Sequence, residues 1–476
     1  MNFIISAETV NFSSDRVWTF LLQIGILAVT VLIGNIVRTK VPFIKKLFIP
    51  SAVIGGVIAL ALKAIPAVKQ YIDGELMQTI TYHCLGLGFA AMALKTEKSN
   101  KKVSTVKIVE SGAIMASSYM LQAIVGLVVS LSMYFLADYF YAAGLILPMG
   151  FGQSTGSALS WGSNYETNYG FEGGASFGLA VASIGFIVGS VIGVIYLNIV
   201  CKKYNLRRRA NVLSKQSIEI ESDLMPESES IDIFTVQICL VIVAYLLSYG
   251  FMRLLALTGI KAIGDLAWGL NFLWALVFAF LIKSVINLLR KKNAIKAQPV
   301  SNVLMDRISG FMFDFMIVGG IVAIDFEDIY KNLWMLVIMC AVGTIATLVY
   351  VRQATKVYKG YELESFLTNF GTVTGTVSTG MILLREVDPE YRTPAASNIV
   401  LQNIPSIALL SPLLLTLGYA GSSVKSAVIM LCVYSTLFVG YSLFLFRRRI
   451  FRKHYASKPD EVWIESEDSA DKDILQ

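Results

Sequence analysis

The sequence predicts an all-α polytopic membrane protein with about eleven transmembrane helices in two inverted-topology repeats. The chain has 476 residues, of which 55% are hydrophobic and only 15% are charged, and a soluble chain of this length needs more charge to cover its surface. Runs of about 20 apolar residues, the length that a helix needs to cross a bilayer, recur along the chain. A third observation, one glycine-rich motif present in two copies, predicts the repeats.

The apolar runs divide the chain into two membrane repeats. The predicted spans lie at about 17–37, 48–65, 77–94, 112–136 and 173–199, and then at about 232–252, 264–288, 302–324, 333–351, 394–418 and 424–446. The first run is predicted to stay in the protein as a span, because no basic cluster precedes it. Residues 1–200 form the first predicted repeat, 201–231 a cytoplasmic linker, 232–446 the second repeat with one extra helix, and 447–476 a cytoplasmic tail.

Lysine and arginine residues predict the orientation of the spans. They concentrate in alternate loops, at 38–46, 95–102, 202–209, 290–296, 352–359 and 447–449. The positive-inside rule makes these loops cytoplasmic, so the N-terminus is predicted outside and the C-terminus inside. The alternation holds only if the stretches 141–162 and 361–384 each enter and leave the membrane on one side. We therefore predict one re-entrant glycine-rich hairpin in each repeat, the first entering from outside and the second from the cytoplasm.

The two glycine-rich stretches share the motif Phe-Gly-x-x-Thr-Gly, at 151–156 and 370–375. Glycines interrupt a helix and free backbone groups, which are tolerated at membrane depth only beside protein or water. Freed carbonyl oxygens and hydroxyls suit a small cation, and freed N–H groups at a helix start suit a carboxylate. Two broken segments that meet near the midplane therefore predict a site for both, unless the small residues only allow close packing.

Polar residues in other spans extend the predicted site. Asp314 lies in the middle of a span, where an unpaired charge is costly, and is interpreted as an ion ligand, a proton relay or a structural pair. Asn398 and Gln402 share one helix face, so they either line the substrate cavity or bond to a neighbouring helix. The predicted substrate-binding residues are Gln153, Ser154, Thr155, Gly156, Asn369, Thr374, Gly375, Thr376, Asn398 and Gln402. The predicted sodium ligands are Thr155, Thr374 and Asp314.

Residues 152–156 also fit G-x-S-x-G, the nucleophile elbow of serine hydrolases. An intramembrane hydrolase would need His83 as the base for Ser154, because the other histidine, His454, lies in the tail. The second copy of the motif has Val373 at the position of Ser154. The repeated feature therefore favours binding over nucleophilic attack, and no catalytic residue is predicted.

Two further patterns are predicted to be structural. Gly185, Gly189 and Gly193 recur every four residues, which is typical of close packing between membrane helices. The five cysteines lie mostly in apolar runs and are predicted to be buried and inert. The net charge of +7 belongs to the loops on one side of the membrane, so no nucleic-acid partner is predicted.

Four segments carry a family resemblance. They are 48–56, which reads Phe-Ile-Pro-Ser-Ala-Val-Ile-Gly-Gly; the stretch 150–171, which ends in Tyr-Gly-Phe; the glycine-rich helix 176–194; and Phe370-Gly371. In these segments the chain resembles the bacterial sodium/glutamate symporter family. The resemblance implies a homodimeric, multi-pass inner-membrane protein of bacteria, in which re-entrant hairpins line the site. It also implies sodium as the coupling ion for glutamate uptake, with no other cofactor.

The predicted function is therefore the import of glutamate or a similar small organic anion with sodium, by alternating access. The wider substrate class is kept because the chain departs from the family pattern at Gln153-Ser154 and at 374–377. One alternative is a proton-coupled carrier or exchanger of another solute, in which Asp314 carries the proton. The other is the serine hydrolase that pairs Ser154 with His83.

Overall fold

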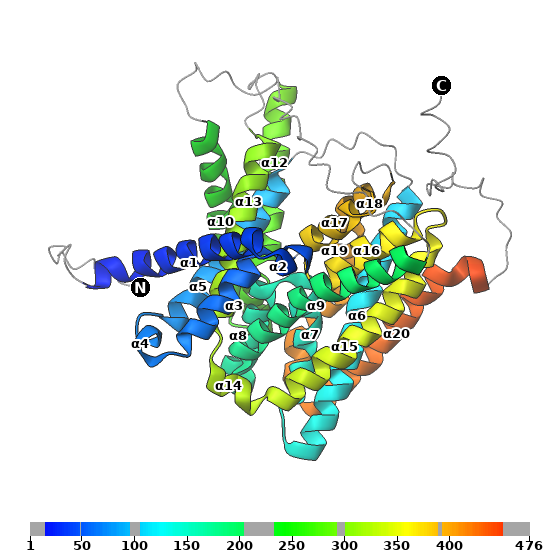
Figure 1. Ribbon diagram of the computed structural model, residues 1–476, viewed down its shortest axis with the longest axis horizontal. Coiled ribbons are helices and arrows are strands. Elements are labelled where there is room, and N and C mark those ends of the chain that lie inside the picture. The colour runs from blue at the N-terminus through cyan, green and yellow to red at the C-terminus, as the bar shows by residue number, and fades with distance from the viewer. Residues whose placement is uncertain are drawn as a thin grey trace.

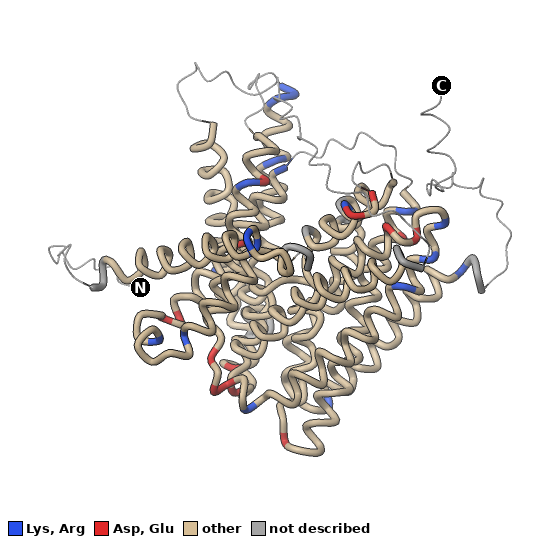
Figure 2. Tube along the Cα trace, in the orientation of Figure 1, with Lys and Arg blue, Asp and Glu red and all other residues tan. Residues whose placement is uncertain are grey.

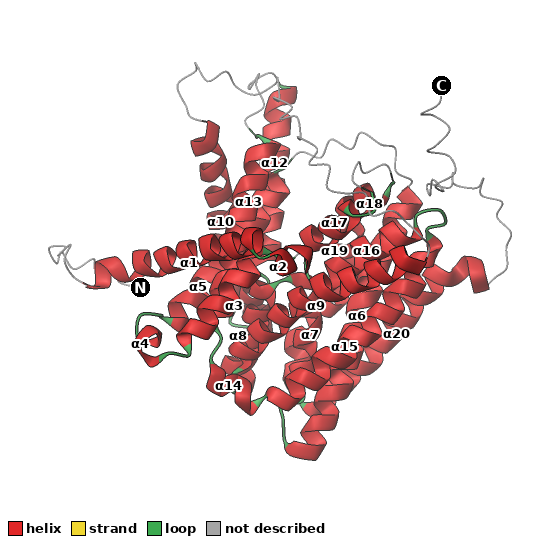
Figure 3. Cartoon of the chain, viewed as in Figure 1, coloured by secondary structure: helices red, strands yellow, loops and turns green. Residues whose placement is uncertain are grey.

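The computed structural model describes residues 15–47, 49–95, 105–203, 233–292, 300–388 and 393–450. Every element in these ranges is a helix, which confirms the predicted all-α class (Figures 1 and 3). The predicted linker 201–231 and tail 447–476 lie outside the described residues, apart from 201–203 and 447–450.

The helices of the first half follow the apolar runs, since a backbone in lipid must satisfy its polar groups within its own helix. Polar caps mark some of their ends: the Asp73 carboxylate accepts the backbone N–H of Leu76 at 3.0 Å and so begins α5. The elements are α1 (Asp15–Lys40), α2 (Pro42–Leu47), α3 (Ser51–Lys63), α4 (Pro66–Lys69), α5 (Gly74–Leu94), α6 (Thr105–Ala137), η1 (Ala143–Leu145), α7 (Ile146–Pro148), η2 (Met149–Gln153), α8 (Thr155–Tyr169) and α9 (Gly174–Lys203).

The second half repeats the order of the first half. Each half has four main helices, then a hairpin of two shorter pieces, then another helix, and α20 is additional. The elements are α10 (Ile233–Ala256), α11 (Lys261–Gly269), α12 (Asn271–Lys291), α13 (Asn302–Ala323), α14 (Phe326–Lys331), α15 (Leu333–Ala354), η3 (Thr355–Val357), α16 (Glu362–Thr374), α17 (Val377–Arg385), α18 (Ala395–Leu401), α19 (Asn403–Gly421) and α20 (Val424–Ile450). The opposite orientation of the two halves in the membrane stays a prediction.

Seven helices of the described chain are long and apolar enough to cross a membrane: α1, α6, α9, α10, α12, α15 and α20. All seven coincide with predicted spans, which confirms the polytopic class. The other four predicted spans coincide with α3, α5, α13 and the pair α18–α19, which are shorter or more polar. The total of eleven therefore stays a prediction. The span predicted at 394–418 is not continuous, because α18 ends at Leu401 and α19 begins at Asn403.

The helices form two groups with α9 between them (Figure 1). In one group α5 packs on α12 and α13, and α3 packs on α1 and α13. In the other group α6 packs on α15, α19 and α20. Helix α9 crosses the centre and contacts α8, η2, α16 and α17, so it adjoins both hairpins.

Outward-facing side chains of the long helices are apolar. On α10 and α15, for example, Leu246 is 59% exposed and Ile345 is 63% exposed. Exposed apolar surface of this extent marks a membrane-contacting or protein-contacting face. The outer faces of these helices are therefore suited to lipid.

Candidate functional site

The first hairpin is broken at Ser154. The chain runs through η2 as far as Gln153 and restarts as α8 at Thr155, with Ser154 as the N-cap residue between them. The Ser154 hydroxyl oxygen accepts the backbone N–H of Ser157 at 3.2 Å, which begins α8. The N-terminus of α8, with its unpaired N–H groups, therefore lies at the break.

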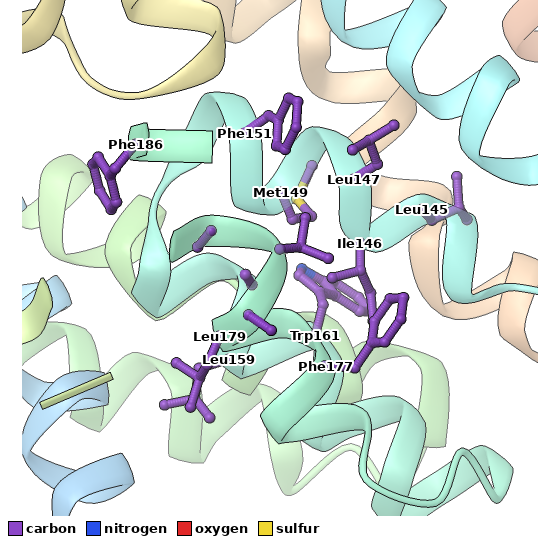
Figure 4. Packing of buried hydrophobic residues seen from close by; sticks show 14 of the residues in the cluster. Leu145, Ile146, Leu147, Met149, Phe151, Leu159, Trp161, Phe177, Leu179 and Phe186 are labelled. Atoms are coloured by element: carbon purple, nitrogen blue, oxygen red, sulfur yellow. The ribbon is translucent and has the colours of Figure 1, made fainter. Parts of the chain in front are cut away.

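An apolar cluster holds this break in the interior. Figure 4 shows Met149 and Phe151 of η2 together with Trp161 of α8 and with Phe177 and Phe186 of α9, all of them buried. Apolar side chains of η2, α8 and α9 thus pack together around the broken segment in this view. The predicted helix break is confirmed here, because the glycine-rich stretch does not form one continuous helix.

The second hairpin is broken at Gly375 and Thr376, between α16 and α17. The Thr376 hydroxyl oxygen accepts the backbone N–H of Thr379 at 3.3 Å and caps α17, as Ser154 caps α8. The two caps do not occupy matching positions of the motif, however, because the residue that matches Ser154 is Val373. The second break thus comes three residues later, so Thr155 follows its break whereas Thr374 precedes its own.

The two broken segments meet at α9. A methyl group added at Gly185 would lie 2.7 Å from the Thr374 carbonyl oxygen and 3.0 Å from Cδ1 of Phe151, so both hairpins reach this glycine. At Gly189 such a methyl group would lie 2.9 Å from Oγ1 of Thr374, and at Gly193 it would meet Leu383 of α17. The predicted packing role of the three glycines is confirmed, and their neighbour is the second hairpin.

Helix α6 also contacts both breaks. Gln122 donates from Nε2 to the Val373 carbonyl oxygen at 2.9 Å and to Oγ1 of Thr347 at 3.2 Å. One turn earlier, the Tyr119 ring fills the space beside Gly152, where an added methyl group would lie 2.1 Å from Cε1. Neither residue was predicted from the sequence. Their only signal is a polar group in the middle of an apolar run.

Four buried polar atoms on or beside the broken segments have no hydrogen-bond partner within the described part of the chain. They are the Tyr119 hydroxyl, Oε1 of Gln122, Oγ1 of Thr155 and Oδ1 of Asn369. The Thr155 side chain is fully buried against α13, since a methyl group at Gly320 would lie 2.2 Å from its Cγ2. Unpaired polar atoms at membrane depth are costly, so atoms that persist there are ready to bind a ligand.

The donor set at the breaks consists of neutral oxygens and helix N-termini. In the described residues no group of three or more His, Cys, Asp or Glu side chains could hold a metal ion. Carbonyl and hydroxyl oxygens can replace the hydration shell of an alkali cation, and helix N-termini attract carboxylates. The arrangement is therefore suited to a monovalent cation and an organic anion.

The sodium/glutamate symporter model matches residues 18–374, about three quarters of the chain. The chain belongs to the sodium/glutamate symporter family. The match confirms the predicted family resemblance and covers the whole first hairpin and α16 of the second. This is a family of transporters and not of enzymes, as predicted. No curated protein matches the chain.

The hydrolase alternative fails in this symporter. Nδ1 of His83 lies 2.9 Å from the Tyr245 hydroxyl on α10, and the Ser154 hydroxyl donates to Oγ of Ser157 at 3.2 Å. The serine and the histidine are thus each engaged elsewhere.

Asn369, Asn398 and Gln402 of the symporter are buried, but their hydrogen bonds lie away from the breaks. Asn369 donates to the Ser365 carbonyl oxygen at 2.8 Å, within α16. Asn398 donates to the Tyr361 hydroxyl at 3.3 Å, and Oε1 of Gln402 accepts the Ser111 hydroxyl at 2.5 Å. Tyr361 precedes α16, so Asn398 bonds near the end of α16 opposite to its break. Their binding role stays a prediction.

Asp314 also lies apart from the breaks. It is half-buried on α13, six residues before Gly320, which corresponds to about 9 Å along the helix axis. Helix α1, which carries Arg38, packs on α13. The ion-ligand, proton-relay and structural interpretations of Asp314 all stay predictions.

Proposed function

We propose that this symporter imports glutamate or a similar small organic anion together with sodium by alternating access. The observation that carries the proposal is the meeting of two broken helices at Gly185 of α9. Each break leaves one helix N-terminus, of α8 or of α17, and helix N-termini in general stabilise a carboxylate. The carbonyl groups freed at the same breaks supply oxygens for sodium.

The proposed substrate and ion site lies around the two breaks. Its inner residues are Thr155, Gly156, Thr374, Gly375 and Thr376, with Gln153, Ser154 and Asn369 beside them. Gly156 is needed for space, because a methyl group there would lie 2.7 Å from Cβ of Leu85 on α5. Asn398 and Gln402 remain candidates for an outer part of the substrate path.

We place the protein in the bacterial inner membrane as a homodimer, with its N-terminus outside and its C-terminus in the cytoplasm. The charge pattern supports this orientation. In Figure 2 most of the coloured Lys and Arg residues lie toward the upper and right edges, and the acidic residues of α14 lie at the lower edge. Clustered cations mark the cytoplasmic ends of membrane helices.

Uptake by the purified protein in liposomes tests the proposal directly. With an inward sodium gradient and the pH gradient collapsed, glutamate or another small carboxylate from a panel should accumulate. Because Asp314 lies apart from the breaks, Asp314→Asn should reduce uptake without changing its sodium dependence. Uptake that is driven by protons alone, and is lost in Asp314→Asn, would instead establish the proton-coupled alternative.

Labelling of single cysteines tests the opposite orientation of the hairpins. Thr167 near the end of α8 and Glu362 at the start of α16 are both exposed, so a cysteine at either position can react. In a cysteine-free background, Thr167→Cys should react with an impermeant thiol reagent added outside intact cells. Glu362→Cys should react only after the membrane is opened. If both react from the same side, the inverted-repeat arrangement is wrong.

A further inference from the structure

The Gln122 side chain is a buried amide whose nitrogen bridges two other helices. It lies near the middle of α6 and is 1% exposed. Its Nε2 sits between two oxygens from other elements, the Val373 carbonyl oxygen of α16 at 2.9 Å and Oγ1 of Thr347 of α15 at 3.2 Å. Its Oε1 is buried with no partner among the described residues. The nitrogen of the amide is thus hydrogen-bonded, and its oxygen is not.

The two oxygens around Nε2 are free to accept a hydrogen bond or bind an ion. Val373 is the second-to-last residue of α16. Its carbonyl is therefore one of the last four in the helix, which accept no hydrogen bond from a backbone N–H of the same helix. Thr347 is fully buried on α15. In this conformation the amide nitrogen donates to both oxygens.

A rotation of the Gln122 amide by half a turn about its last side-chain bond exchanges its nitrogen and oxygen. Oε1 then faces the space between the same two oxygens, and three neutral oxygens from α6, α15 and α16 surround it. Such a set suits an alkali cation, which carbonyl and hydroxyl oxygens bind in place of water. It does not suit a divalent metal, since no carboxylate is part of it.

We propose that Oε1 of Gln122, Oγ1 of Thr347 and the Val373 carbonyl oxygen form a sodium site, and that the Gln122 amide nitrogen fills this site while sodium is absent. The inference rests on the proposed function and names the coupling-ion position within it. When sodium enters, Gln122 no longer donates a hydrogen bond to the Val373 carbonyl oxygen. Its Oε1 becomes a ligand of the ion instead. Sodium thereby joins α6 and α15 to the second hairpin directly before its break.

The bridging contact of its nitrogen, and not the unpaired oxygen alone, distinguishes Gln122 from other buried amides. Asn271, Asn369, Asn398 and Gln402 also have one unpaired end among the described residues. Nε2 of Gln122 lies between two oxygens of two other helices, whereas Asn369 donates within its own helix and Asn271 donates to a single carbonyl oxygen. The unpaired Oε1 of Gln122 is accounted for if it serves the ion.

The test measures sodium binding without any substrate, as the rise in melting temperature of the purified full-length protein when sodium replaces choline. Thr347→Val keeps the shape of the side chain and removes one ligand, and Gln122→Leu removes another. Each should raise the half-saturating sodium concentration about 5- to 150-fold, which corresponds to one lost polar contact. Thr344→Val is the matched control. It lies one turn earlier on α15, is buried, and its hydroxyl donates to the Cys340 carbonyl oxygen of its own helix.

The outcomes separate this site from the proposed function. If Thr347→Val binds sodium as the parent and the Thr344→Val control do, while sodium still drives uptake, the ion lies elsewhere and only this inference fails. If sodium neither stabilises the parent protein nor drives its uptake, the proposed sodium coupling fails together with the site. A loss of sodium affinity in Thr347→Val with an unchanged Thr344→Val supports the site, even if Gln122→Leu does not fold.

Discussion

Replacing Thr155 with valine is expected to weaken ligand binding while leaving the unliganded protein at least as stable as before. The Thr155 side chain is fully buried, its methyl group packs against Gly320 of α13, and its hydroxyl has no partner among the described residues. Valine keeps the shape and removes the unpaired hydroxyl, whose burial costs about 1–3 kcal/mol. If substrate or sodium pairs with this hydroxyl, the same change should lower apparent affinity about 5- to 150-fold.

The opposite signs of the two effects make this prediction specific. A structural threonine would lose stability on substitution, whereas a ligand-binding one should lose affinity without losing melting temperature. Thr344→Val is the control, because Thr344 is buried on α15 outside the proposed site and its hydroxyl donates to the Cys340 carbonyl oxygen of its own helix at 2.7 Å. Its effect on half-saturating glutamate and sodium should be smaller. Equal affinities of Thr155→Val and the parent protein would remove Thr155 from the site.

Replacing Arg447 with methionine is expected to destabilise the protein by up to about 3 kcal/mol, since breaking a buried ion pair leaves one charge without compensation. Arg447 of α20 donates to Oε1 of Glu110 of α6 at 2.8 Å, and the Glu110 side chain is only 2% exposed. Lys107 lies 3.7 Å from the other carboxylate oxygen, so part of the Glu110 charge stays compensated when Arg447 is replaced. The estimate stays at the low end for buried pairs because the Arg447 side chain is 29% exposed.

A double-mutant cycle measures this effect. The melting temperature of Arg447→Met should fall, and adding Glu110→Gln should restore most of the loss, because the buried charge is then gone. Lys331→Met is the control: its partner Glu172 is exposed and 3.3 Å away, and such pairs contribute about 1 kcal/mol or less. Equal losses in Arg447→Met and Lys331→Met would show that the extra helix α20 is not held by this pair.

Hydropathy and one repeated motif predicted the class of fold and a helix break in each glycine-rich stretch. These features are local: a long apolar run specifies a span, and glycines followed by hydroxyl residues specify a helix break with its cap. The exact residue of each break was not predictable in the same way. In the first hairpin the π-helix η2 ends earlier in the motif and packs against α9 and α8, which are tertiary contacts that the local sequence does not specify.

The partners of the buried polar residues were also beyond prediction from sequence. Gln122 meets Val373 and Thr347, which lie 251 and 225 residues away in the chain, and a single polar residue in an apolar run carries no periodic signal. Asn398 lies on α18, but Gln402 is the turn residue between α18 and α19, so their assignment to one continuous helix was wrong. Their bonds to Tyr361 and Ser111 depend on how α18 docks between α6 and α16, which hydropathy does not encode.

The different positions of the two breaks within the motif have a consequence for the direction of transport. In a carrier of two related halves, exchange of the conformations of the halves converts the outward-open state into the inward-open state. Equal halves would give these two states equal energies. Here one half presents the Thr155 hydroxyl after its break, and the other presents the Val373 carbonyl before its break. If the two halves exchange conformations as proposed, we expect the two resting states to differ in free energy, and the apparent affinity for substrate to differ between the two sides of the membrane.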